Sequence, residues 1–230
     1  MKFLKMKHML LMFAIVVGMS ACSEDSDPIP EVFTRFGFMY TDGGNYFIDI
    51  DGGEKLMVES FDDEGVELDA YDRVLATFSI KETPEETILY DYLVELKGFY
   101  DIDFSDIVTL DDDSRDTIGD GFITVTDMGI SENYLNLQIF YAQQKGSHVF
   151  SLCYDATQQE DGEAVILDLY NYYPEEEEDG GANYYTYQTY DLSELSSLLE
   201  LNEDNEIEFR IRVNKGDSQE KIYQVVYDPS

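Results

Sequence analysis

A repeated alternation of apolar and polar side chains constrains the fold of this chain more than any other feature. Its clearest case lies at residues 206–213, where Ile207, Phe209, Ile211 and Val213 alternate with acidic and basic residues. Successive side chains of a β-strand point to opposite faces, so this pattern is typical of a strand with one buried and one solvated face. Similar segments, bounded by Gly, Asn or acidic turns, recur along most of the chain. The sequence therefore predicts an all-β protein.

The first series of predicted strands lies in the N-terminal half of the chain. Its segments are residues 32–40, 45–51, 55–60, 73–80 and 88–96, with glycine turns at 42–44 and 51–53. Phe36, Phe38 and Tyr40 share one face of the first segment, and Val74, Ala76 and Phe78 are expected to point inward from the fourth. Five strands within about 70 residues are typical of a small closed barrel. We therefore expect a five-stranded, OB-like barrel domain at residues 32–112.

A second series of strands follows the charged stretch at residues 110–116, which has no apolar periodicity and is expected to mark a domain boundary. The predicted strands are residues 122–128, 133–141, 147–154, 164–173, 184–190, 206–213 and 221–227. Asp191, with Glu194 three residues later, is expected to open a short helix that runs through residue 201. Seven strands and one short helix predict a β-sandwich at residues 117–230.

The N-terminus has the layout of a bacterial lipoprotein signal. Lys2, Lys5 and Lys7 precede an apolar run at residues 9–19, and small residues lead to Cys22. We expect a signal peptide at 1–21, lipidation of Cys22 and an acidic tether at 22–31, so that acyl chains alone hold the protein at a membrane. The acidic string at 23–27 resembles the export tag of surface lipoproteins of Bacteroidetes, which implies an outer-membrane, cell-surface location. The alternative is an ordinary cleaved signal in which Cys22 has no role.

The charge of the chain limits the partners that it can bind. It has 50 acidic and 14 basic residues, a formal net charge of −36. A field of this sign repels nucleic acid and anionic lipid head groups, attracts cationic peptides and leaves neutral glycans unaffected. We therefore expect no nucleic-acid partner. The alternative interpretation of the charge is solubility at a crowded cell surface.

The sequence offers little for catalysis. Beyond Cys22, the chain has one histidine, His148, and one cysteine, Cys153, which lie on opposite faces of one predicted strand. We expect His148 to be a packed, hydrogen-bonded core histidine, the alternative being a ligand or a base, and we expect Cys153 to fill a core position. Because no nucleophile, phosphate-loop or zinc motif occurs, we predict a protein that is not an enzyme and has no cofactor or metal site. Calcium at the loop aspartates is left open. They are Asp49, Asp51, Asp111, Asp112, Asp113, Asp116 and Asp120.

A group of tyrosines beside a run of acids is the candidate binding site. We call it the tyrosine-rich face and define it as Tyr172, Tyr173, Tyr184, Tyr185 and Tyr187 with Glu175, Glu176, Glu177 and Glu178. Tyrosine combines a large contact area with a polar tip, which suits a surface for a protein, a cationic peptide or a sugar. The alternative is that alternate tyrosines pack within the sandwich and the others cover sheet faces.

Several stretches resemble the NigD-like lipoproteins of Bacteroidetes. They are residues 45–49, 72–76, 90–94, 133–137, 146–152 and 190–195, which together span nearly all of the chain after the signal. The resemblance implies an OB-like N-terminal barrel and a C-terminal β-sandwich. It also implies a relation to a founding member that is suspected to be a bacteriocin immunity protein. The first hypothesis is thus a surface lipoprotein that binds a partner or confers immunity, and the second is an accessory glycan-binding module of a polysaccharide-uptake system.

Overall fold

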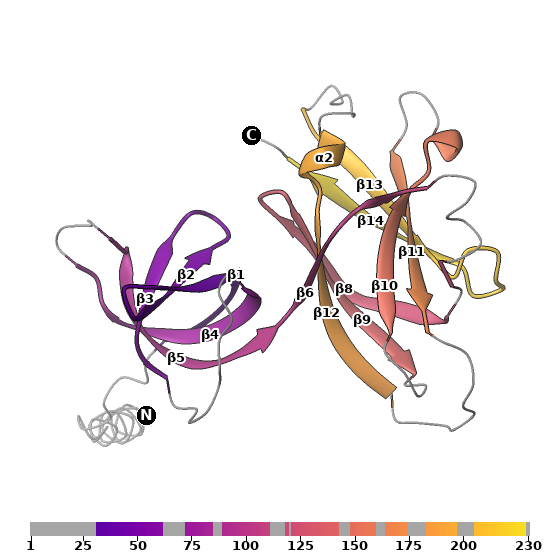
Figure 1. Cartoon of the computed structure of the whole chain (residues 1–230). Helices are drawn as coiled ribbons and strands as arrows, with labels where there is room; N and C mark the ends of the chain where they lie inside the picture. Colours follow the sequence, from indigo (N-terminus) through magenta and orange to yellow (C-terminus); the bar gives the residue numbers. More distant parts are fainter. Residues whose placement is uncertain are drawn as a thin grey trace, which may run out of the picture. The chain divides into compact units, whose positions relative to one another are not determined.

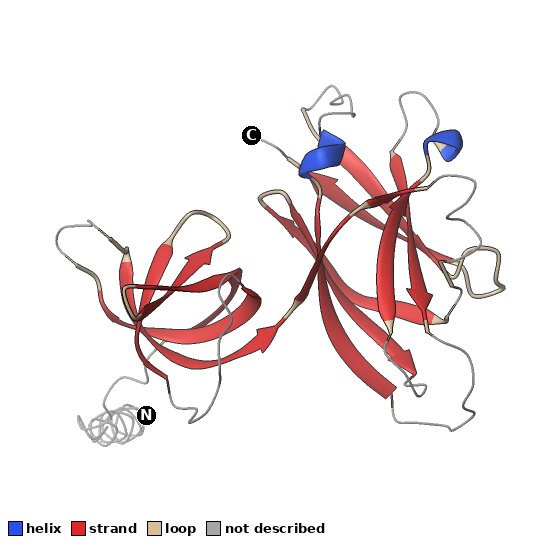
Figure 2. Cartoon of the chain, in the orientation of Figure 1, coloured by secondary structure: helices blue, strands red, loops and turns tan. Residues whose placement is uncertain are grey.

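The computed structural model describes residues 31–61, 72–84, 89–110, 118–119, 121–142, 148–159, 164–173, 183–196 and 205–228. Strands make up most of this part of the chain (Figure 2), and the prediction of an all-β fold is confirmed. Of the predicted signal peptide and tether, only Glu31 is among the described residues. Within those ranges, no helix has the length and apolar character needed to cross a membrane.

The first five strands form a closed barrel (Figure 1). They are β1 (Val32–Asp42), β2 (Asn45–Ile50), β3 (Lys55–Phe61), β4 (Asp72–Glu82) and β5 (Tyr92–Asp101). Their order around the barrel is β1-β2-β3-β5-β4, in which only the β3–β5 pair is parallel. Closure leaves no unpaired sheet edge in this module. The predicted five-stranded barrel is confirmed.

Apolar side chains from alternate positions fill the barrel. Val74, Ala76 and Phe78 of β4 point into this core, as the alternation predicts. Strand β1 differs, because its fully buried core residue is Met39, whereas Phe36 and Phe38 lie on the opposite face. Both faces of β1 are thus apolar, one towards the barrel interior and one towards aromatic rings of the second module.

Nine strands build the second module as two sheets. They are β6 (Asp103–Asp106), β7 (Val108–Thr109), β8 (Ile123–Ser131), β9 (Tyr134–Ala142), β10 (Val149–Tyr154), β11 (Val165–Tyr172), β12 (Asn183–Asp191), β13 (Ile207–Val213) and β14 (Lys221–Tyr227). One sheet has the order β14-β13-β11-β10-β7 and the other the order β6-β12-β9-β8. The predicted β-sandwich is confirmed.

The sandwich core follows the alternation on which the prediction was based. Ile207, Phe209, Ile211 and Val213 of β13 are all buried, and they pack against apolar side chains of both sheets. The fully buried Tyr190 of β12 belongs to this core, and its Oη donates a hydrogen bond to the Phe150 carbonyl oxygen at 3.1 Å. This bond satisfies the polar tip of Tyr190 and ties one sheet to the other.

Two short strands were not predicted. β6 pairs in parallel with β12, and β7 pairs in parallel with β10, so the chain enters both sheets of the sandwich within a few residues of leaving β5 (Figure 1). The range 32–112 expected for the barrel therefore contains two strands that pair with the sandwich. Segments of four and two residues are too short for alternation to be recognised.

The short helix after β12 is present as a single turn. α2 (Ser193–Ser196) follows Asp191, whose Oδ1 accepts a hydrogen bond from the Ser193 backbone N at 2.8 Å. The remainder of the helix expected through residue 201 lies outside the described residues. A second short turn, η2 (Ala156–Gln158), follows β10 and is capped by the Asp155 side chain.

A buried polar network joins the barrel to the sandwich. Arg73 of β4 donates through both Nη atoms to the Asp51 carboxylate at 2.5 Å and through Nη2 to Asn136 Oδ1 of β9 at 3.0 Å. Ser131 Oγ of β8 donates to the same carboxylate, and Thr189 Oγ1 of β12 donates to Asn136 Oδ1. The Arg73 side chain is completely buried. This network holds the two modules in contact.

Aromatic rings enclose the guanidinium of Arg73. Its Cζ lies 4.8 Å from the centre of the Phe38 ring and 4.7 Å from that of the Tyr134 ring. The face of an aromatic ring attracts a cation, most strongly where water is excluded. The sequence predicted that Phe36 and Phe38 share one face of β1. In the structure this face covers the charged guanidinium of Arg73.

Candidate functional site

Three members of the tyrosine-rich face are exposed beside the segment that joins the two sheets. Tyr172 ends β11 with 44% of its surface exposed, and Tyr184 and Tyr185 near the start of β12 are 41% and 61% exposed. Residues 174–182, which connect these two strands, lie outside the described residues. The four glutamates of the face, Glu175 to Glu178, belong to that segment, and Cys22 also lies outside the described residues.

A chain of ring contacts connects the two sheets at this end of the sandwich. The Tyr184 ring lies 6.4 Å from that of Tyr141, the Tyr141 ring 4.5 Å from that of His148, and the His148 ring 5.6 Å from that of Tyr173. His148 Nδ1 is hydrogen-bonded to Asn171 Oδ1 at 2.9 Å. The predicted packing and hydrogen bonding of His148 are confirmed, but its side chain is only partly buried and does not belong to the sandwich core. These contacts fix the ring of Tyr184 against the sandwich.

Tyr185 and Tyr187 lie on the outer face of the β6-β12-β9-β8 sheet in different surroundings. The exposed Tyr185 ring packs on Phe140 of β9, with 5.0 Å between ring centres. Tyr187 accepts a hydrogen bond from Gln138 Nε2 at 2.8 Å, and its ring contacts those of Phe36 and Tyr100 in the barrel. The structure thus places Tyr185 at the surface and Tyr187 among intramolecular contacts.

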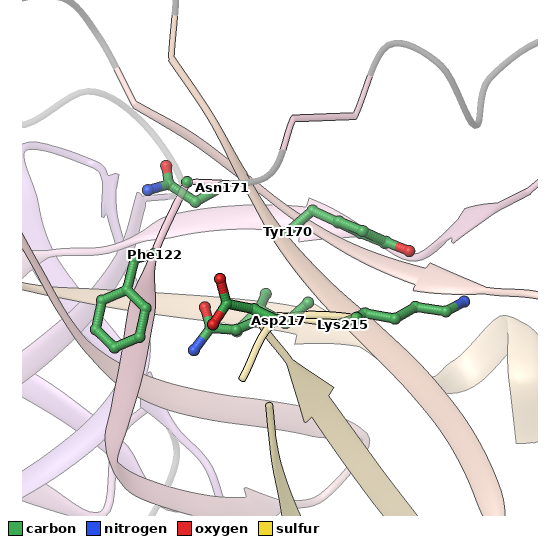
Figure 3. Close-up of a pocket in the computed structure, with 9 residues that line it drawn as sticks. Phe122, Tyr170, Asn171, Lys215 and Asp217 are labelled. Atoms are coloured by element: carbon green, nitrogen blue, oxygen red, sulfur yellow. The ribbon is translucent and has the colours of Figure 1, made fainter. Parts of the chain in front are cut away.

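A pocket of about 210 Å³ opens between β11 and the turn that follows β13 (Figure 3). Phe122, Tyr170, Asn171, Lys215 and Asp217 contribute side chains to its wall. Figure 3 shows the Phe122 ring, the Asn171 amide and the Asp217 carboxylate towards one end, while the Tyr170 and Lys215 side chains extend the opposite way. This pocket could not be recognised in the sequence, because its residues come from distant segments with no common spacing.

An ion cluster lies next to this pocket on the outer face of the β14-β13-β11-β10-β7 sheet. Arg212 donates to both carboxylate oxygens of Asp168, at 2.6 and 2.9 Å, and Lys215 Nζ donates to Oδ2 at 3.0 Å. Gln158 Oε1 accepts from both cations. The hydrogen bond to Asp168 is the main cause that raises the pKa of Arg212. Because the Asp168 side chain is only 3% exposed, this cluster is a part of the folded framework.

Cys153 lies beside the same cluster and is completely buried, as predicted. Burial, with a smaller contribution from the negative charge of Asp168, raises the pKa of its thiol to about 12. The thiolate is the reactive form of cysteine, so this thiol is inert near neutral pH. The same two causes raise the pKa of Tyr170 to about 12.

The loop aspartates that were considered as calcium ligands either have other partners or lie outside the described residues. Asp51 binds Arg73, and Asp49 pairs with Lys55 at 3.4 Å. The residues numbered 111, 112, 113, 116 and 120 are not described. In the part of the chain that the structure covers, no three acidic, histidine or cysteine side chains are grouped so that they could hold a metal ion.

Solved structures share this two-module fold. A protein of unknown function from Bacteroides vulgatus is 21% identical with a TM-score of 0.67, and the match covers 86% of this chain and 91% of that one. A NigD-like immunity protein from Bacteroides caccae is 16% identical with a TM-score of 0.59 and coverages of 89% and 100%. A protein designated a lipoprotein from Bacteroides fragilis is 15% identical with a TM-score of 0.59 and coverages of 86% and 98%. At these identities the similarity shows the fold alone.

The sequence itself carries the family assignment. No curated protein is similar to this chain in sequence. The model of the NigD-like C-terminal beta sandwich domain matches residues 106–226, which is more than half of the chain and spans the strands of the sandwich from β7 to all but the last residue of β14. The chain therefore belongs to the NigD-like family.

Proposed function

We propose that this protein is a non-enzymatic, surface-anchored lipoprotein of the immunity type that binds a protein or a cationic peptide through its tyrosine-rich face. The observation that carries the proposal is the exposure of Tyr172, Tyr184 and Tyr185 on either side of an acidic segment. Exposed aromatic side chains beside charged residues are typical of surfaces that bind other proteins.

The packing of the tyrosines suits them to binding. Tyr184 rests on Tyr141 and Tyr185 rests on Phe140, so each ring is supported by a neighbour in the sheet. A side chain that is already ordered loses less conformational entropy when a partner binds. The net charge of −36 adds a long-range attraction for cationic partners, which raises the rate of association.

The charged framework favours binding over catalysis. The Arg73–Asp51 pair is buried, and in the Arg212–Asp168 pair the carboxylate is buried and the arginine partly so; several hydrogen bonds hold each pair. The Cys153 thiol is buried with a raised pKa. Side chains in these positions stabilise the fold, whereas the exposed tyrosines remain available to a partner.

The proposed location follows from the signal and from the structural relatives. The layout around Cys22 supports lipidation, and the relatives include an immunity protein and a protein designated a lipoprotein. A lipid anchor in the outer membrane with the protein facing outward would place the tyrosine-rich face where it meets incoming peptides. Protease treatment of intact cells tests this location, since protection of the protein until the cells are lysed would contradict it.

Calorimetric titration with a lysine-rich amphipathic peptide tests the binding proposal. We expect binding that weakens as salt is added, because salt screens the attraction between exposed charges. Tyr185→Ala should weaken it by roughly tenfold, since truncation of an exposed aromatic anchor costs more than about 1 kcal/mol. Conversion of Glu175, Glu176, Glu177 and Glu178 to glutamine should weaken binding and reduce its dependence on salt.

Two matched controls test whether peptide binding depends on the tyrosine-rich face or only on the overall tyrosine content and net charge of the protein. Tyr46→Ala removes an exposed tyrosine of the barrel and should leave peptide binding unchanged. Conversion of four exposed barrel acids, Asp42, Glu54, Glu59 and Glu82, to amides changes the net charge by the same amount as the loop variant. Equal losses in the two charge variants would show that the peptide responds to net charge alone and would contradict a binding face.

A further inference from the structure

We propose that the pocket between Phe122, Asn171 and Asp217 is a binding site for one ring of a neutral sugar. This site adjoins Tyr173 of the tyrosine-rich face but is lined by other side chains, and it does not depend on the function proposed for that face. Its volume of about 210 Å³ is below the roughly 300 Å³ at which pockets for drug-sized ligands begin. One sugar ring is of the right size, and a longer chain would extend out of the pocket.

A hydrogen-bond donor in the pocket wall is not bonded to the described residues. Asn171 is only 2% exposed, and its Oδ1 is bonded to His148 Nδ1. Its Nδ2 makes no hydrogen bond to any residue that the structure describes. Nδ2 is therefore available to a ligand in the pocket. A ligand that covers Nδ2 without accepting a hydrogen bond from it would leave a polar group unsatisfied, so a ligand that accepts this bond is favoured over one that merely fills space.

Gly121 keeps this donor accessible. A Cβ atom at residue 121 would lie 2.7 Å from Asn171 Nδ2 and 2.7 Å from Tyr173 Cε1. Both distances are too short for any side chain. The Gly121 backbone N also donates to the Asn171 carbonyl oxygen at 2.9 Å, which holds the two residues together. Glycine at residue 121 thus leaves room beside the Asn171 amide that any other residue would fill.

A carboxylate and an aromatic ring complete the wall. Asp217 Oδ1 accepts hydrogen bonds from Ser218 Oγ and from the Gln219 backbone N, which orients the carboxylate. Asp217 Oδ2 has no bond to the described residues and can accept one from a ligand. Phe122 is 44% exposed, and Figure 3 shows its ring at the same end of the pocket as the Asp217 carboxylate.

These three groups distinguish between classes of ligand. An anion would be repelled by Asp217, and Lys215 cannot offset that charge because its ammonium is bound to Asp168 and Gln158. A cation would leave the Asn171 donor without a partner, and a hydrocarbon would leave both polar groups without one. A sugar ring has hydroxyl groups that donate and accept, and it has a C–H face that packs on an aromatic ring. A neutral sugar therefore suits all three of these groups.

Ligand-observed NMR with methyl glycosides of glucose, galactose, mannose and N-acetylglucosamine tests the proposal on the lipid-free mature protein. At least one glycoside should receive saturation from the protein, bind in the millimolar range and shift the Asn171 side-chain amide signals. Phe122→Ala should weaken binding by roughly tenfold. Asp217→Asn should also weaken binding by roughly tenfold. The asparagine side chain can keep the oxygen that accepts from the Gln219 backbone N, but an NH₂ donor replaces Oδ2, which would accept from the sugar.

The controls separate this site from the tyrosine-rich face. Asp42→Asn makes the same chemical change at an exposed turn and should leave sugar binding unchanged, as should Tyr185→Ala. Conversely, Phe122→Ala should still bind the cationic peptide, so failure of one proposal does not imply failure of the other. The sugar site is contradicted if none of the four glycosides binds, or if binding persists in both pocket variants. Binding of methylammonium with loss in Asp217→Asn would show a cation site instead and would equally overturn the proposal.

Discussion

Arg73 of the barrel and Asn136 of the sandwich are joined by a hydrogen bond of 3.0 Å from Nη2 to Oδ1. The same guanidinium is paired with Asp51 and is completely buried, while its Nε has no hydrogen-bond partner among the described residues. A buried charge of this kind is stable only while all of its partners stay in place. The contact between the modules is therefore sensitive to any change at Arg73.

Arg73→Met should destabilise the protein by about 3–5 kcal/mol, because it leaves the Asp51 carboxylate buried without its counter-ion. Urea denaturation measures the change. Arg35→Met alters an exposed arginine of the same barrel and should change stability by less than about 0.5 kcal/mol. The double variant Arg73→Met with Asp51→Leu should recover part of the loss. A single variant as stable as the wild type would show that the pair contributes nothing.

The Cys153 thiol should resist modification in the folded protein. Its pKa of about 12 leaves almost no thiolate at pH 8, and the side chain is buried. An aromatic disulfide reagent should therefore react at the rate of unfolding in buffer and at once in urea. Ser151→Cys, made together with Cys153→Ser, places a thiol on the same face of β10 at a partly exposed position and should react quickly. Fast reaction of native Cys153 would contradict its burial.

Stability should fall as the pH rises above 10. An unfolded tyrosine ionises near pH 10.0, whereas burial raises the pKa of Tyr170 to about 12 and that of Tyr190 still further. Between these values the unfolded chain binds fewer protons than the folded one, so the free energy of unfolding decreases with pH, and the contribution is complete below pH 10. Denaturation at several pH values measures the slope. Tyr170→Phe should reduce it between pH 10 and 12, and an unchanged slope would show that this phenol titrates normally.

Gly119→Ala should destabilise the protein by about 1–3 kcal/mol. Residue 119 has φ of +80°, and a Cβ there would lie 2.6 Å from the Tyr172 Cα. Gly98→Ala provides a matched control, because a Cβ in that position of β5 meets no atom within 4 Å. The control should be unchanged or slightly more stable, since alanine has less freedom than glycine in the unfolded chain. Similar denaturation midpoints for the two variants would contradict the close contact at Gly119.

Long strands with one buried face were predictable from the sequence. The row from Ile207 to Val213 and the row from Val74 to Phe78 are buried as expected, and the boundaries of β14 at Lys221 and Tyr227 match the prediction. Alternation was less informative at β1, where Phe36 and Phe38 pack against the sandwich while Met39 fills the barrel. A strand that is buried on both faces carries no signal for which face is the core.

The candidate sites were predictable in part. The exposed Tyr184 and Tyr185 lie next to each other in the chain, so their proximity was visible in the sequence. Phe122, Asn171 and Asp217 meet only because β11 pairs with β13 and the chain before β8 returns to the end of β11. Contacts of this kind depend on sheet order, which alternation does not determine.

The direct passage from β5 through β6 to β7 has a consequence for where the barrel and the sandwich can be separated. A gene fragment that starts at residue 106, where the family match begins, would lack nearly all of β6. Residues 188–191 of β12 would then lose their hydrogen-bonded neighbour. A sandwich that began at that point would lack the edge strand β6. An intact sandwich therefore has to begin at about residue 102, directly after the last barrel strand. The sandwich therefore cannot be separated from the barrel at any point within residues 103–109 without the loss of strand pairing in one of its two sheets.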